Sequence, residues 1–108
     1  MQLDLPLPIV TYFTKHGRSS AGIADLFVQD ATVKDEGHTY TGTAAIAAWM
    51  DESSAKYDFT SRPVASETVD GAVVVTCHVT GNFPGSPVDL RYLFQIDGDK
   101  ITSLEIIP

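Results

Sequence analysis

Residues 87–107 read PVDLRYLFQIDGDKITSLEII, and they predict two strands joined by a turn. From 87 to 96 apolar and polar side chains alternate, and the apolar set is Leu90, Tyr92, Phe94 and Ile96. A period of two is typical of a strand with one buried face. The Asp97-Gly98 pair that follows is a hairpin signal, because glycine tolerates positive φ, and 100–107 is predicted as the returning strand.

Two more strands are predicted upstream, at 57–69 and 72–82, with Asp70-Gly71 between them. The glycine- and proline-rich segment 81–87 then connects this pair to the last two strands as a loop. Along 72–82 alternate residues form an apolar face, made of Val73, Val75, Cys77 and Val79. The opposite face is mixed in character, so it can be solvated or can carry a dimer.

The first part of the chain is predicted to be helical. A first helix begins near Pro6 to Pro8 and ends at Gly17, since proline suits a first turn and glycine a helix end. Its apolar face has spacings of three and four, through Ile9, Tyr12, Phe13 and His16. A short second helix, capped by Ser19 or Ser20, is predicted to carry Ile23, Leu26 and Phe27.

A strand at 31–35 and a loop between Gly37 and Gly42 separate these helices from a third. Thr43 can cap this third helix, whose buried stripe is Ile46, Trp49 and Met50. Helices followed by an antiparallel meander predict an α+β fold with the helices packed on one sheet face. We expect residues 1–108 to form a single domain.

Composition excludes several kinds of partner and site. The net charge of −7 argues against nucleic acid and against anionic membrane surfaces. The single cysteine, Cys77, allows no intramolecular disulfide and is predicted to be a small core residue. No apolar run reaches membrane-spanning length, and no basic segment precedes an apolar one at the N-terminus, so we expect a cytoplasmic location.

The predicted core is small, as expected for 108 residues. It comprises Phe13, Leu26, Phe27, Ile46, Trp49, Val75, Val79 and Phe94. Because dimerisation would add burial, we expect a homodimer through the outer sheet face, which contains Thr76, His78, Arg91 and Leu93.

Residues 26–35, LFVQDATVKD, resemble the steroid Δ5-isomerases and the wider SnoaL-like group of the nuclear transport factor two superfamily. The resemblance continues through 41–46, TGTAAI, and resumes at 97–101, DGDKI. It implies a cystatin-like curved antiparallel sheet, wrapped by three N-terminal helices into a cone with one pocket. It implies no cofactor, and a small apolar molecule as the ligand.

The resemblance also implies roles for two residues. Asp35 matches the isomerase general base, and Tyr12 matches the helix tyrosine that donates a hydrogen bond to the oxyanion. The second oxyanion donor of the isomerases, a protonated aspartate, has no match: Arg91 falls there without a gap, and Asp89 only after a shift. The implied activity is proton transfer beside the carbonyl of a cyclic, apolar compound, as in an isomerase or polyketide cyclase. The alternative is a non-catalytic binding or dimerisation module.

The residues themselves leave alternatives open. A carboxylate at a strand end that faces an apolar cone has a raised pKa, which suits an acid or base near neutral pH. Equally, Asp35 could begin a polar loop, and Tyr12 could be a core aromatic. The ligand-binding candidates are His38, Tyr40, Trp49 and Tyr57; an exposed loop position is the alternative for His38, and a core position for Trp49 and Tyr57. The three histidines lack an HxH or HExxH spacing, so no metal site is predicted.

Overall fold

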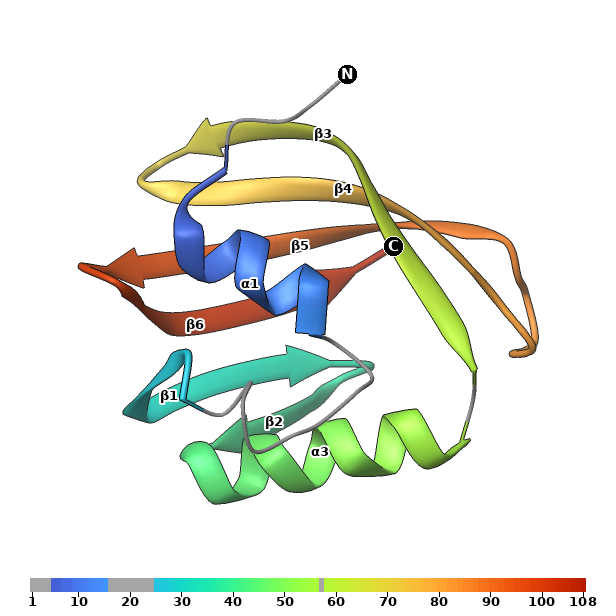
Figure 1. The fold of residues 1–108 in the computed structure, drawn as a ribbon, viewed down its shortest axis with the longest axis horizontal. Helices are drawn as coiled ribbons and strands as arrows, with labels where there is room; N and C mark the ends of the chain where they lie inside the picture. Colours follow the sequence, from blue (N-terminus) through green and yellow to red (C-terminus); the bar gives the residue numbers. More distant parts are fainter. Residues whose placement is uncertain (1–4, 16–24, 57) are drawn as a thin grey trace.

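The computed structural model describes residues 5–15, 25–56 and 58–108, and these form one sheet with helices on one side (Figure 1). The elements in chain order are α1 (Leu7–Lys15), β1 (Phe27–Asp35), β2 (His38–Thr41), α3 (Thr43–Lys56), β3 (Phe59–Val69), β4 (Ala72–Gly81), β5 (Val88–Asp97) and β6 (Lys100–Ile107). The strand order is β2-β1-β6-β5-β4-β3. The predicted α+β class and its curved sheet are confirmed.

The four C-terminal strands are confirmed to within two residues at each end, and they pair as the predicted antiparallel meander. The sheet as a whole is mixed, because β1 pairs with β6 in parallel. This departs from the antiparallel sheet that was predicted. The reason is topological: β1 joins the last strand only after α3, β3, β4 and β5 have been traversed, and a connection that long permits parallel pairing.

Two local predictions are corrected. Phe27, placed on a second helix, is the first residue of β1 and pairs with Ile101, while Leu26 lies in the turn before it. The rest of that predicted helix, like His16 and Gly17, lies outside the described residues. The loop predicted between Gly37 and Gly42 contains a strand, β2, because the chain reverses in two residues after β1. Glu36 and Gly37 make that turn with φ values of 53° and 80°, as a tight hairpin requires.

The helices cover the inner face of the sheet. In Figure 1, α1 lies across β5 and β6, and α3 lies under β1 and β2. Of the predicted core residues, Phe13 and Leu26 are partly buried against the cluster and the other six are buried. Cys77 is buried among them, as predicted. Within the described residues, neither α1 nor α3 is long and apolar enough to cross a membrane.

Candidate functional site

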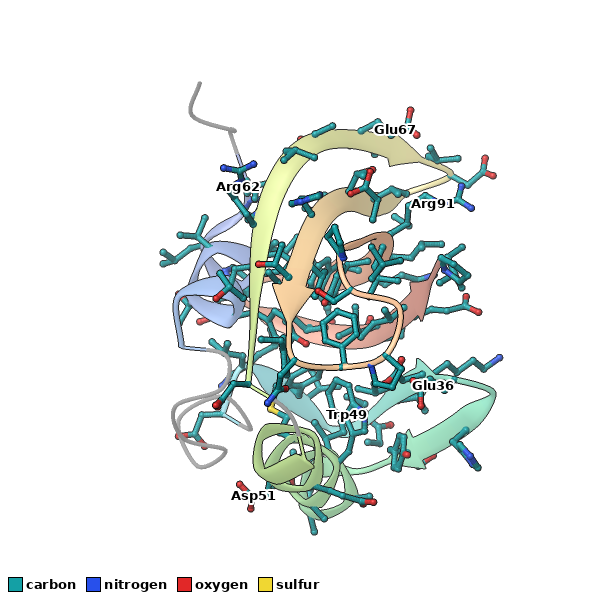
Figure 2. All side chains as sticks on the ribbon, turned by 90° about the vertical axis from the view of Figure 1, so that its right-hand side faces the viewer. Glu36, Trp49, Asp51, Arg62, Glu67 and Arg91 are labelled. Atoms are coloured by element: carbon teal, nitrogen blue, oxygen red, sulfur yellow. The ribbon has the colours of Figure 1, made fainter. Side chains whose placement is uncertain are left out.

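A cavity of about 490 Å³ lies on the inner face of the sheet. Its wall is mostly apolar and aromatic, with a few polar groups on one side. The lining residues are Asp35, Glu36, Tyr40, Trp49, Glu52, Phe59, Val79, Phe83, Pro84, Val88, Leu90, Tyr92 and Ile106. Figure 2 shows Trp49 on the sheet side of α3, whereas Asp51, also on α3, points away from the sheet. Glu36 lies at the β1–β2 hairpin.

Asp35 is the last residue of β1 and lies in the cavity wall. The sheet register pairs it with Ile106 of β6 on one side and His38 of β2 on the other. Its side chain is held from the helix layer, because Trp49 Nε1 donates a hydrogen bond of 3.1 Å to Asp35 Oδ2. Trp49 is itself only 5% exposed, so packing fixes the donor. The carboxyl group therefore has a defined direction at the edge of an apolar space.

Burial raises the pKa of Asp35 above its ordinary value of 3.8. The hydrogen bond from Trp49 opposes this shift, since it stabilises the ionised form. The charge of Glu36 adds to the rise in pKa, and His38 opposes it. The net direction is upward, towards the pH range in which a carboxyl group can both accept and return a proton.

Tyr12 is fully buried on α1 and does not line the cavity. Its ring packs edge-on against four aromatic rings at centroid distances of 5.2–6.4 Å, those of Phe13, Phe27, Tyr92 and Phe94. Burial raises the pKa of Tyr12 well above 10.0, and the charges of Tyr92 and Asp35 add to the rise. The role of Tyr12 as an oxyanion donor stays a prediction.

Tyr92 is a cavity residue that the sequence analysis treated only as part of an apolar strand face. It is 2% exposed and lines the wall from β5, and its hydroxyl oxygen lies 3.3 Å from Ser61 Oγ on β3. The sequence shows only that a tyrosine, which carries a polar hydroxyl group, occupies a strand position on the apolar face. That pattern alone could not show that the residue lines a cavity.

The other predicted site residues divide into two groups. Tyr40 and Trp49 both line the cavity, with ring centroids 6.0 Å apart. His38 is exposed on β2 and does not line it, and Tyr57 lies outside the described residues. In the described parts of the chain, no group of three or more His, Cys, Asp or Glu side chains could hold a metal ion.

Neither Arg91 nor Asp89 lines the cavity, because both lie on the outer face of β5. Asp89 Oδ1 lies 2.8 Å from His78 Nδ1 on the neighbouring strand. Arg91 donates a hydrogen bond of 3.2 Å to the carbonyl oxygen of Pro108. Neither residue that aligns with the protonated aspartate of the isomerases therefore contributes a side chain to this cavity wall.

The curved sheet, the helix layer and the half-buried carboxyl define a small pocket-forming domain. The model of the SnoaL-like domain matches residues 12–104, and the chain belongs to this family. No curated protein matches the sequence. A protein from Sinorhizobium meliloti, proposed to be a polyketide cyclase, is 34% identical, with a TM-score of 0.90 and 95% of each chain covered.

Two more distant structures share the fold. One is a Catenulispora acidiphila protein with a ketosteroid isomerase-like fold, in complex with trimethylamine. It is 20% identical, with a TM-score of 0.84, over 97% of this chain and 87% of that one. The other is TerC, co-crystallised with polyporic acid, at 18% identity and a TM-score of 0.76, over 93% of this chain and 87% of that one.

Proposed function

We propose that the cavity binds a small, mostly apolar, cyclic carbonyl compound and that Asp35 transfers a proton at the carbon beside the carbonyl. One observation carries this proposal: a half-buried carboxyl group, with a raised pKa, lies in the wall of a cavity lined by apolar and aromatic side chains and by the exposed Glu36 and Glu52. Cavities of a few hundred cubic ångströms suit small molecules, and their few polar groups orient the ligand.

The chemistry follows from the geometry of the carboxyl group. Since Oδ2 accepts the hydrogen bond from Trp49, we assign proton transfer to Oδ1. The ionised carboxyl accepts a proton from the carbon, and the bonding electron pair moves into the carbonyl to form an enolate. The protonated carboxyl can then return the proton to another carbon. Alternatively, the enolate carbon attacks a second carbonyl of the ligand and closes a ring, and Asp35 returns the proton to the alkoxide that forms. Isomerisation and aldol-type cyclisation therefore share this first step.

The comparisons support a small-molecule ligand. The Sinorhizobium meliloti protein is proposed to be a polyketide cyclase, and cyclisation of this kind uses the same first step. TerC was crystallised with polyporic acid, and the Catenulispora acidiphila protein with trimethylamine. All three are similar to this chain over most of its length, which favours a small-molecule pocket here.

The test is hydrogen–deuterium exchange at the carbon beside the carbonyl, followed by NMR in D₂O with cyclohexanone, 1-tetralone and a steroid ketone. The wild-type protein should accelerate exchange for at least one ketone. Asp35→Asn keeps an oxygen to accept the Trp49 hydrogen bond but cannot take a proton, so exchange should fall about 10²–10⁴-fold. Asp89→Asn, on the outer face, is the matched control and should leave exchange at the wild-type rate.

The alternative is a binding module without catalysis, which the mostly apolar wall also favours. The same experiment separates the two. If a ketone binds, as judged by changes in the protein spectrum, but exchange does not exceed the buffer rate, the binding module is correct. Equal exchange by wild type and Asp35→Asn would remove Asp35 from the mechanism.

A further inference from the structure

Tyr92 and Asp35 lie in one row across the inner face of the sheet. The register pairs Asp35 of β1 with Ile106 of β6, and Ile106 with Tyr92 of β5. Strands in a sheet lie about 4.8 Å apart, so the two backbones are separated by roughly 10 Å, with one residue between them. All three side chains line the cavity. A ligand lying over Ile106 therefore has Asp35 on its β1 side and the Tyr92 ring on its β5 side, and its oxygen would extend towards β3 to meet the Tyr92 hydroxyl near Ser61.

Within the described residues, the Tyr92 hydroxyl oxygen lies 3.3 Å from the Ser61 hydroxyl, and either group can be the donor. A hydroxyl can donate one hydrogen bond and accept others. If Ser61 donates to Tyr92, the Tyr92 proton is available to a ligand in the cavity. Ser61 comes from β3 and is half-buried, so sheet packing holds the pair in place.

Burial raises the pKa of Tyr92 to about 12, and Ser61 partly opposes the rise. The charges of Cys77 and Asp35 add smaller contributions to the rise in the pKa of Tyr92. Tyr92 is therefore a neutral hydrogen-bond donor throughout the neutral pH range. A neutral donor held in a water-poor site stabilises a developing oxyanion most effectively when its direction is fixed in advance.

We infer that Tyr92 donates the hydrogen bond to the carbonyl oxygen of the ligand and that Ser61 is the residue that positions Tyr92. This inference rests on the proposed function. It assigns the donor to a strand residue that lines the cavity, whereas the family resemblance marks Tyr12, which does not line it. As the oxygen gains negative charge while Asp35 takes the proton from carbon, the Tyr92 proton strengthens its hydrogen bond without being transferred.

The first test uses the ketone exchange assay. Tyr92→Phe should lower the exchange rate about 10²–10³-fold, the usual cost of losing one oxyanion donor, while ketone binding changes little. Tyr12→Phe should lower the rate less than Tyr92→Phe does. The reverse order would overturn the assignment. Melting curves for each variant establish that it is folded.

The test of Ser61 needs a measurement that would not change if Ser61 had only a structural role, and the ketone exchange rate of two variants supplies it. Ser61→Ala should lower exchange, and Ser61→Thr, which restores a hydroxyl, should recover most of the rate. If Ala and Thr lower the rate equally while both variants melt like the wild type, Ser61 does not position Tyr92.

The second test separates this inference from the proposed function. The probe is 2-naphthol, whose oxygen imitates an enolate, bound to the Asp35→Asn protein, in which no proton transfer to residue 35 is possible. Adding Tyr92→Phe should weaken binding about tenfold, the value of one hydrogen bond in a buried site. If Tyr92→Phe weakens naphthol binding but the wild-type protein does not accelerate ketone exchange, Tyr92 is a hydrogen-bond donor and the proposed reaction is wrong. Exchange that needs Asp35 but not Tyr92, with unchanged naphthol binding, would reject the donor.

Discussion

The two faces of β5 use polar side chains in opposite ways. On the inner face, Tyr92 is buried and its hydroxyl meets Ser61 at the cavity wall. On the outer face, Asp89 and Arg91 are exposed and meet His78 and the C-terminal carbonyl. The same strand therefore carries a buried hydroxyl group in the cavity wall on one face and exposed charged side chains on the other.

Asp35 and Asp89 show what this difference means for a carboxyl group. Both lie on strands and both have a nitrogen partner, the Trp49 indole for Asp35 and the His78 ring for Asp89. Only Asp35 is half-buried in a cavity wall, and burial is the largest cause of its raised pKa. The two carboxyl groups therefore differ in burial, which depends on the face of the sheet that each occupies.

The largest expected effect comes from truncating the inner layer. Trp49→Ala removes a buried ring that packs the core and also orients Asp35, so it should lower the free energy of unfolding by about 3–5 kcal/mol. Leu93→Ala, on the outer face, is the comparison and should cost far less. Urea denaturation of both variants measures the difference. A Trp49→Ala variant that unfolds at the same urea concentration as the wild type would contradict a larger contribution of the inner face to stability.

A second prediction concerns assembly through the outer face. We expect a homodimer, because the core is small and this face is mixed, with Leu93 half-buried opposite Val74 and beside the exposed Arg91. Leu93→Arg would bring a charge into that contact and should give a species of 11.7 kDa, half the wild-type mass, in sedimentation at micromolar concentration. A wild-type protein that sediments only at 11.7 kDa would contradict the dimer. Ketone exchange should survive in Leu93→Arg, since the cavity lies on the other face.

Much of the fold could be predicted because the relevant signals are local. Alternation of side-chain character and the Asp70-Gly71 and Asp97-Gly98 turns predict two hairpins, four strands in all, to within two residues at each end. Phe27 was misplaced because a short apolar run fits a helix face or a strand equally well. The parallel pairing of β1 with β6 joins distant parts of the chain, and no local pattern reports it.

The site could be predicted only in part, for the same reason. A strand end followed by a glycine turn, together with the resemblance, led to Asp35 in the cavity wall. The hydrogen bond from Trp49 depends on how α3 packs against β1, which the sequence does not show. Tyr12 and Tyr92 both lie on apolar faces, and only the placement of α1 over β5 and β6 shows which of them reaches the cavity.

The raised pKa of Asp35 also links the site to stability. Its pKa is higher in the folded chain than in the unfolded one, so the protonated form favours folding. That contribution is fully present below about pH 3.8, and it is lost as the pH rises through the folded-state pKa. Asp35→Asn should therefore remove this pH dependence and should be no less stable than the wild type at neutral pH.

The pKa of Asp35 itself tests the central claim most directly. It can be measured by following the carbon-13 shift of the Asp35 carboxyl group through a pH titration of the folded protein. We predict a midpoint above 3.8, and a still higher midpoint in Trp49→Phe, which keeps a ring but loses the hydrogen bond that favours ionisation. A midpoint at or below 3.8 in the wild-type protein would show that the carboxyl group behaves as if it were in water, and would contradict its assignment as the proton carrier.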